Sequence, residues 1–443
     1  MKRFVWLGFV SSIFIILIGC GETFRPIIVP NPPIFPNPKA AHSVISINDN
    51  STAVPGTAMV VDVSGDTNIS VTDVGIAPVH AVQQAANQIL VVNQAAPGVQ
   101  AASITKLLFN SILIFGKSTI SLPPNSAPNF VASTEPTQAY VTLPGLTPPS
   151  VGVVNTVSDA VTNTIAVGNN PVALAETPNG QKLYVANQGD NTVGSYNTSD
   201  RSLRSVITGF SSPVWLNARS DSQRIYVLNQ ASSLVSTIDT TSTAGPDTVI
   251  GTTLAAPNAS YMLYDVNLNR LYIPGASELV MLDASQSIPQ PVSGSPVLIP
   301  AVAPTSRPST GDPCFTTAVT TLNTIAVTAL PDGSRVYVGS YYKDASNNIC
   351  PQVTVIDAVS NTIKGNIAIP GFAAFDSFCS TTRFRLMMAS AGDSSRAYLS
   401  SCDGGSVNII DTSKDAYVGN LPAPAGTRFG NPPQSPVFLI AGP

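Results

Sequence analysis

The sequence of 443 residues has little charge and little histidine. Asp, Glu, Lys and Arg together make up only 10% of the chain, against roughly 25% in an average soluble domain. The formal net charge of -4 is small, and no basic patch of the kind that contacts nucleic acid is present. The two histidines, His42 and His80, have no metal-ligand spacing. These shortages argue against a nucleic-acid binder, a zinc site and a histidine-based triad, and we expect His80 to be a hydrogen-bonded core or channel side chain.

The apolar run Phe4–Ile18 is too short for a comfortable membrane span and follows a basic start. It leads into the letters LIGC, which resemble the lipobox of bacterial lipoproteins. The resemblance implies a signal peptide over residues 1–19 and a lipid on Cys20, so that the protein contacts the membrane through an anchor. An ordinary signal peptide with an incidental cysteine is the alternative. Gly21, where an Asp would resemble an inner-membrane retention signal, favours the outer membrane.

Residues 20–40 contain six prolines and predict an extended, semi-rigid tether. Beyond it, short apolar runs alternate with turn-forming residues. The stretch from Pro171 to Pro213 has four such runs and is then repeated. Short strands at this spacing indicate an antiparallel meander, and a four-stranded repeat of roughly 40–45 residues is typical of a propeller blade. The sequence therefore predicts an all-β fold, a β-propeller of four-stranded antiparallel blades, in a single domain over residues 41–443.

The two ends of this domain predict a closed ring. Ser43–Ile47, Ala58–Val63 and Ile69–Val74 match strands two, three and four of a blade whose first strand is missing. Pro436–Ile440 matches that first strand, so strands from both termini would complete one blade and protect its edges. Counting the second-strand signatures gives eight blades, and seven blades remain the alternative because two signatures are degenerate.

The stretches PVALAETPNGQKLYVANQ and VTVIDAVSNTIKGNIAIPG resemble the YVTN family of bacterial β-propeller repeats. The resemblance is strongest over residues 151–239 and 330–370. It implies an exported propeller of the surface-layer or lactonase-like type. The repeat itself brings no catalytic motif.

Three residue types recur at fixed places in the repeat. Because one position in successive blades does the same local work, we interpret each series as structural. We expect aspartates after the third strand to accept backbone N–H bonds in the turn, tyrosines of the second strand to pack between blades, and Asn-Gln pairs at the end of that strand to cap turns. A ligand-binding polar rim is the alternative for the pairs. The series are Asp239, Asp283, Asp357 and Asp411; Tyr140, Tyr184, Tyr226, Tyr272, Tyr337 and Tyr398; and Asn93-Gln94, Asn187-Gln188 and Asn229-Gln230.

Four further cysteines predict two disulfides in an exported protein. Cys314 and Cys350 flank the turn near residue 332, and Cys379 and Cys402 flank the turn at residues 392–394. Because facing positions of an antiparallel hairpin have a constant index sum, we predict the pairs Cys314–Cys350 and Cys379–Cys402.

Three long connections interrupt the repeat, at residues 285–314, 341–351 and 370–382, and the last two carry cysteines and aromatic residues. Exposed aromatics there would form a binding patch, and a small satellite core is the alternative. The candidate binding residues are Tyr341, Tyr342, Phe372, Phe375 and Phe378.

Together these patterns predict a lipid-anchored, extracytoplasmic and monomeric propeller at the cell envelope. We expect a non-catalytic binding or scaffold module for a protein, peptide or glycan, with no cofactor and no nucleic-acid partner. A lactonase-like hydrolase or isomerase with a site at the channel mouth is one alternative, which convergent Asp, Glu or Arg side chains would favour. A structural surface-layer component is the other.

Overall fold

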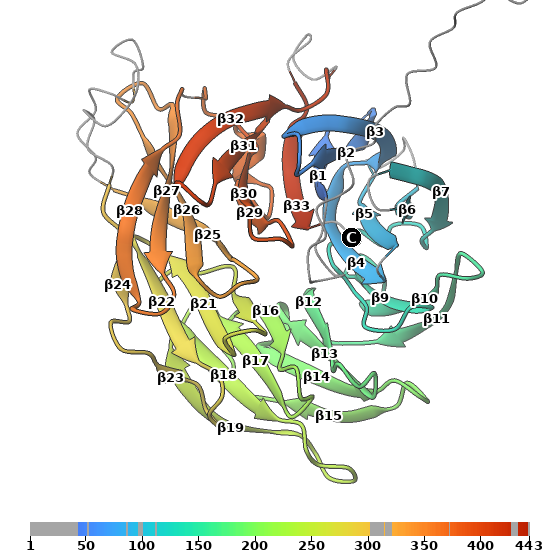
Figure 1. Ribbon diagram of the computed structural model, residues 1–443. Coiled ribbons are helices and arrows are strands. Elements are labelled where there is room, and N and C mark those ends of the chain that lie inside the picture. The colour runs from blue at the N-terminus through green and yellow to red at the C-terminus, as the bar shows by residue number, and fades with distance from the viewer. Residues whose placement is uncertain are drawn as a thin grey trace, which may run out of the picture. The chain divides into compact units, whose positions relative to one another are not determined.

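The computed structural model describes residues 43–50, 53–85, 87–95, 101–110, 113–301, 314, 321–371, 373–426 and 433–441. Residues 39–443 form one compact unit. Across the described residues, eight antiparallel sheets follow one another around a ring (Figure 1). The predicted propeller is confirmed with eight blades, and the alternative of seven is wrong. The predicted signal peptide and tether, with Cys20, lie outside the described residues, as does His42.

Each blade is a meander that runs from an inner to an outer strand. The first four blades consist of β33 (Ser435–Ala441), β1 (Ser43–Asp49), β2 (Pro55–Asp62) and β3 (Thr67–Ile76); β4 (Pro78–Ala85), β5 (Gln88–Asn93), β6 (Ser103–Asn110) and β7 (Leu113–Ser121); β8 (Val131–Ala132), β9 (Gln138–Leu143), β10 (Ser150–Asn155) and β11 (Ala160–Ala166); and β12 (Pro171–Glu176), β13 (Lys182–Asn187), β14 (Thr192–Asn197) and β15 (Leu203–Ile207).

The remaining four blades follow the same plan. They consist of β16 (Pro213–Ala218), β17 (Arg224–Asn229), β18 (Leu234–Asp239) and β19 (Thr248–Leu254); β20 (Leu263–Asp265), β21 (Arg270–Gly275) and β22 (Glu278–Asp283) with the short pieces β23 (Gln290–Pro291) and β24 (Val297–Leu298); β25 (Asn323–Ala329), β26 (Arg335–Lys343), β27 (Ile349–Asp357) and β28 (Thr362–Ala368); and β29 (Leu386–Ser390), β30 (Arg396–Ser401), β31 (Ser406–Asp411) and β32 (Ala416–Pro422). Two short 3₁₀ turns are described, η1 (Gln188–Asp190) and η4 (Phe378–Ser380). No helix among the described residues is long and apolar enough to span a bilayer.

Strands from the two ends of the chain close the ring, as predicted. β33 pairs antiparallel with β1, with Ile45 opposite Ile440, and becomes the inner strand of the first blade. The side chains of Val437, Phe438 and Leu439 are buried there. The closing strand is therefore part of the core, and the edge of β1 is covered.

Burial follows the position of a strand within its blade. All six residues of β13 in the blade interior are buried, whereas the outer strand β19 is mostly half-buried or exposed. Inner strands of successive blades contact each other, for example β4 and β8, β12 and β16, and β25 and β29. Strands that are covered on both faces need apolar residues at successive positions, which explains the continuous runs in the sequence.

The prediction of a long loop at residues 341–351 is wrong. β26 and β27 continue to Lys343 and Ile349, and Tyr342 lies opposite Cys350. The actual turn is short, and the Asp344 carboxylate accepts the backbone N–H groups of Ser346 and Asn348. The apolar pattern of the two strands simply extends beyond the length that the other blades have.

Candidate functional site: the central channel

The predicted binding aromatics lie in two segments that a backbone bridge between Ile349 and Ala373 brings together. Tyr342 is fully buried, and its hydroxyl donates to the carbonyl oxygen of Cys314 at 2.9 Å. Tyr341, Phe375 and Phe378 are half-buried, and Phe372 lies outside the described residues. The aromatic segments therefore fold partly onto the protein. A role in binding a partner stays a prediction for these residues.

Two of these aromatics pack against a buried ion pair. Both oxygens of the Asp403 carboxylate accept hydrogen bonds from Arg385, from Nε and Nη2, each at 2.7 Å, and the Asp403 side chain is fully buried. The Arg385 guanidinium lies 4.7 Å from the centre of the Phe375 ring and 5.5 Å from that of Tyr341. These cation–π contacts hold the loop between β28 and β29, which carries Phe375, near β26, which carries Tyr341.

Both predicted disulfides are present, Cys314–Cys350 and Cys379–Cys402, each with 5.8 Å between the two Cα atoms. The geometric reason that we gave for the pairing is wrong. Cys350 lies on the third strand β27 opposite Tyr342, and Cys379 lies on η4 outside any hairpin. Each bridge ties a connecting segment to the end of a strand, so the near-symmetric spacing around a turn was coincidental.

The loop held by Cys379 carries Arg383 to the centre of the ring. Its Nη1 and Nη2 atoms donate to the carbonyl oxygens of Val172 and Val214, each at 2.8 Å, on the inner strands of two blades. Among the described residues no acidic side chain forms an ion pair with Arg383. Burial lowers the pKa of this guanidinium from its usual range to about 10. Arg383 is thus a desolvated cation whose hydrogen-bond partners are neutral carbonyl groups.

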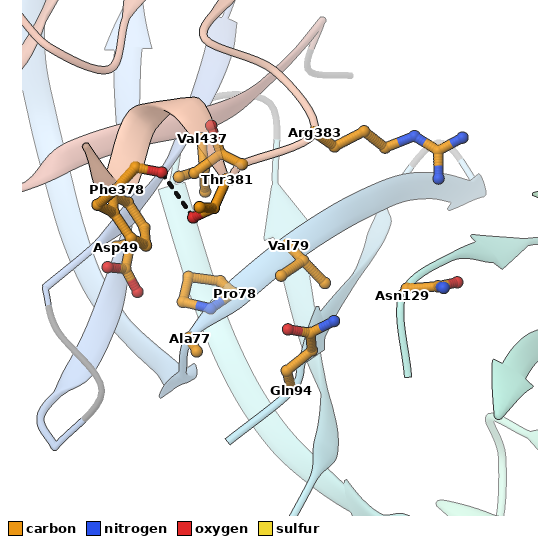
Figure 2. Close-up of a pocket in the computed structure, with 11 residues that line it drawn as sticks. Asp49, Ala77, Pro78, Val79, Gln94, Asn129, Phe378, Thr381, Arg383 and Val437 are labelled. Atoms are coloured by element: carbon orange, nitrogen blue, oxygen red, sulfur yellow. Dashed lines mark hydrogen bonds between the residues drawn. The ribbon is translucent and has the colours of Figure 1, made fainter. Parts of the chain in front are cut away.

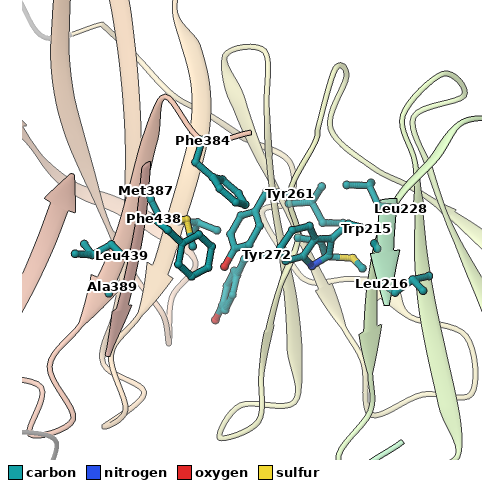
Figure 3. Packing of buried hydrophobic residues seen from close by; sticks show 14 of the residues in the cluster. Trp215, Leu216, Leu228, Tyr261, Tyr272, Phe384, Met387, Ala389, Phe438 and Leu439 are labelled. Carbon is teal, nitrogen blue, oxygen red and sulfur yellow. The ribbon is translucent and has the colours of Figure 1, made fainter. Parts of the chain in front are cut away.

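An aromatic plug surrounds Arg383, and we define it as His80, Phe130, Trp215, Tyr261, Phe384 and Phe438. The guanidinium lies 4.9 Å from the centre of the Trp215 ring and 5.0 Å from that of Phe130. His80 stacks on Phe130 at 4.0 Å, and Trp215 meets Tyr261 edge-on at 4.9 Å. Figure 3 shows Phe384, Tyr261, Trp215 and Phe438 converging between the inner strands. The plug fills the middle of the channel.

His80 belongs to this plug as a buried side chain, as predicted. The backbone N–H of Val131 points at its Nδ1 atom from 3.4 Å. Burial, and secondly the positive charge of Arg383, hold the pKa of His80 well below its usual range. A neutral imidazole can stack beside a guanidinium without charge repulsion, which suits a structural side chain.

A first cavity lies on the side of the plug where the inner strands begin. This Arg383 cavity has a volume of about 290 Å³ and includes Pro78, Val79 and Val437 from the starts of β4 and β33. Its polar lining comes from Asp49, Gln94, Asn129, Thr381, Thr382 and Arg383. Figure 2 shows the Arg383 guanidinium and Asp49 at opposite sides of the view, with Val79 between them. Phe378 also lines this cavity, so one predicted binding residue borders it.

A second cavity, the Glu176 cavity, lies on the other side of the plug and has a volume of about 470 Å³. Residues toward the ends of the inner strands line it, among them Glu176, Asn217 and Ser390. His80, Phe130, Trp215, Tyr261 and Phe438 form its apolar end. The plug therefore separates two cavities of different chemistry.

The periodic side chains do structural work, as interpreted. The carboxylates of Asp239, Asp283, Asp357 and Asp411 each accept a backbone N–H two residues further on. The six tyrosines are fully buried, and hydroxyls bond across blades, for example from Tyr184 to Asp247 at 2.9 Å. Asn93 and Asn229 accept the backbone N–H groups of Gly75 and Ser211, which confirms capping for these two. Of the paired glutamines, Gln94 lines the Arg383 cavity.

Arg383 and Glu176 were not predicted as site residues. Neither belongs to a periodic series, and the contacts that place them join distant parts of the chain. A signal for Arg383 exists, because Arg383 and Arg385 follow a stapled segment in a chain with very few charges. Within the described ranges, no three His, Cys, Asp or Glu side chains gather closely enough to hold a metal ion.

Comparison with known proteins supports the fold. No protein-family model matches the sequence, and no curated protein matches it. The structure is similar to dihydro-heme d1 dehydrogenase NirN in complex with DHE, at 9% identity over 90% of this chain and 75% of the other, with a TM-score of 0.60. It is similar to AztD of Citrobacter koseri, at 11% identity over 90% of this chain and 98% of the other, with a TM-score of 0.60. It is also similar to a Bacteroides fragilis protein provisionally assigned as a 6-phosphogluconolactonase, at 11% identity over 92% of this chain and 99% of the other, with a TM-score of 0.48.

The likenesses to NirN and AztD, at 9% and 11% identity, define a class of fold and no activity. The chain is an eight-bladed β-propeller with a plugged channel. Its disulfides suggest an extracytoplasmic location.

Proposed function

We propose that this propeller is a non-catalytic binding module whose ligand presents a carboxylate or similar anionic group to Arg383. The observation that carries the proposal is the guanidinium of the half-buried Arg383, which lies in the wall of the Arg383 cavity and has no acidic partner among the described residues. Isolated charges are costly to bury, and buried charges in proteins are usually paired. An anionic ligand group would supply the missing counter-charge.

The rest of the wall fits a small ligand with a polar and an apolar side. Asn129, Gln94 and Thr382 offer hydrogen bonds, and Val79 and Val437 offer apolar contact. A volume of about 290 Å³ lies at the lower end of the range of ligand pockets, roughly 300–1,000 Å³. The cavity would hold a small molecule or the end of a longer one, such as a peptide.

An anchored position at the cell envelope belongs to the same proposal. The lipobox-like ending at Cys20 supports a lipid anchor, Gly21 supports the outer membrane, and the proline-rich stretch of residues 20–40 would hold the propeller away from the bilayer. The repeat sequence supports membership of the YVTN family. The two disulfides also favour a location outside the cytoplasm.

A lactonase-like reaction receives less support from the Arg383 cavity. Among the described residues that line it, Asp49 is the one acidic side chain, and none is a histidine. General acid–base chemistry needs a proton donor and acceptor within reach of the same reacting group. The lining suits recognition of charge more than proton transfer.

Binding of matched probes tests the proposal. Phenylacetate and the neutral phenylacetamide would be titrated into the full-length protein by calorimetry. Hydrogen bonds to charged groups contribute about 1.5–3 kcal/mol, so we expect phenylacetate to bind at least about tenfold more tightly. Arg383→Gln should remove this preference, and Lys414→Gln should keep it, because Lys414 is 73% exposed and carries the same charge.

Two results would count against the proposal. Equal affinity for the acid and the amide would show that no cation in the cavity recognises the carboxylate. A preference that persists in Arg383→Gln would place the recognition elsewhere. The comparison of the two probes on the unaltered protein stands even if Arg383→Gln folds poorly.

A further inference from the structure

Among the residues that the structure describes, three polar atoms beside the Glu176 cavity have no hydrogen-bond partner. They are Oε1 of Glu176, Oδ1 of Asn217 and Nε1 of Trp215, and all three residues line the cavity. Each atom is withdrawn from bulk water. Buried polar groups in proteins almost always have a partner, so three exceptions around one cavity call for an explanation.

Of the three groups, the Glu176 carboxyl has the highest free-energy cost of burial, because it can carry a charge. Glu176 ends β12 and is only 4% exposed. Its Oε2 atom accepts the backbone N–H of Thr134 at 2.8 Å, and no described cation pairs with either oxygen. Glu135 is the charged neighbour that acts on it, and the effect is repulsive. Burial raises the pKa of Glu176, and the hydrogen bonds from Thr134 offset only part of this effect.

Asn217 and Trp215 give the cavity a defined polarity. Asn217 contributes a second hydrogen-bond acceptor from the neighbouring inner strand, β16. Trp215 contributes one donor, its indole N–H, together with an aromatic surface beside Tyr261 and Phe438. Two acceptors, one of them a carboxyl, and an aromatic end are the features that recognise an organic ammonium group.

We propose that the Glu176 cavity is a second ligand site, which binds a small molecule with a protonated amino group. The ammonium donates to Glu176 Oε1 and Asn217 Oδ1, and the apolar part of the ligand rests on the aromatic plug. The terminal torsions of Glu and Asn side chains are soft, so both oxygens can turn toward the cavity at small cost.

Arg383 does not oppose this arrangement. Its guanidinium forms part of the other cavity's lining and is not among the residues that line the Glu176 cavity. Its charge acts on His80, whereas the charge that acts on Glu176 is that of Glu135. The two sites therefore have opposite charge preferences and lie on opposite sides of the plug.

Benzylamine and benzyl alcohol test the second site on the full-length protein. They have nearly the same shape and differ in charge, and calorimetry would measure both affinities. We expect benzylamine to bind at least about tenfold more tightly, a difference of about 1.4 kcal/mol. Glu176→Gln should abolish the preference. Glu278→Gln, which removes the same charge from another blade, should preserve it.

The variant Glu176→Gln also separates binding from stability. It keeps the size of the side chain and removes a buried charge that no described cation pairs with, so its melting temperature should be unchanged or higher. Equal affinity for amine and alcohol, a preference that survives Glu176→Gln, or no binding of benzylamine would each overturn the proposal. Phenylacetate binding at Arg383 is measured separately, so either proposal can fail without the other.

Discussion

Replacing Asp247 tests how neighbouring blades are held together. This carboxylate precedes β19 of the fifth blade, and its side chain is fully buried. All its partners are in the fourth blade: Lys182 Nζ at 2.7 Å, Tyr184 Oη at 2.9 Å, Ser195 Oγ at 2.5 Å and Arg204 Nε at 3.4 Å. The side chains of Lys182 and Arg204 are only 10% and 9% exposed.

Asp247→Asn keeps the volume and removes the charge that two buried cations share. Breaking a buried ion pair from one side costs about 3–5 kcal/mol, because the partner charge stays desolvated. We expect a loss of that size, measured as a lower midpoint of urea unfolding with tyrosine fluorescence as the probe. Asp200→Asn, in an exposed turn, is the matched control and should leave the midpoint almost unchanged.

A double-mutant cycle makes the reasoning refutable. In the Asp247→Asn background, Lys182→Met removes one of the two buried cations that have lost their counter-charge. It should therefore recover part of the lost stability. A loss below about 1 kcal/mol in Asp247→Asn would mean that water or a rearrangement compensates the cations. The interpretation that the Asp247 carboxylate holds the fourth and fifth blades together would then be wrong.

Three further predictions concern the closure of the ring by β33, the disulfide Cys379–Cys402 and the pH dependence of benzylamine binding. Removing residues 435–443 deletes the inner strand of the first blade, and burial of about 1.5–3 kcal/mol for each of its three core side chains would be lost, so we expect an unfolded or aggregated product by light scattering. Breaking Cys379–Cys402 with paired Ser substitutions opens a link across 23 residues, which should cost about 3 kcal/mol and weaken phenylacetate binding, because the loop carries Arg383. Benzylamine binding should weaken as pH falls, because the raised pKa of Glu176 means that its carboxyl gains a proton, and loses its attraction for ammonium, at a higher pH than an exposed glutamate would. An affinity that stays constant as the pH falls from about 8 to about 4.3, the usual pKa of an exposed glutamate, would contradict this assignment. Described titratable and charged groups near Glu176 include Glu135, Tyr140 and the neutral His80, and Arg201 lies near Tyr140.

The repeat made much of the fold predictable from the sequence. Each blade position faces the same neighbours, so a tyrosine or aspartate that recurs every blade reports one recurring contact. Turn residues mark the strand ends for a local reason: their side chains cap the backbone, as Asp239 does for Thr241. Closure was also predictable, because β33 copies the first-strand pattern that the N-terminal blade lacks.

Singular features could only be placed by the tertiary structure. Arg383 reaches the carbonyl of Val172, 211 residues away in the sequence, and it can do so only once eight blades surround a common centre. Glu176 stands at the end of an ordinary first strand, and both its burial and its hydrogen bond from Thr134 depend on the neighbouring blade. Local patterns determined the blades because strands and turns form from nearby residues. The channel chemistry was decided by the ring, because it arises where distant segments exclude water together.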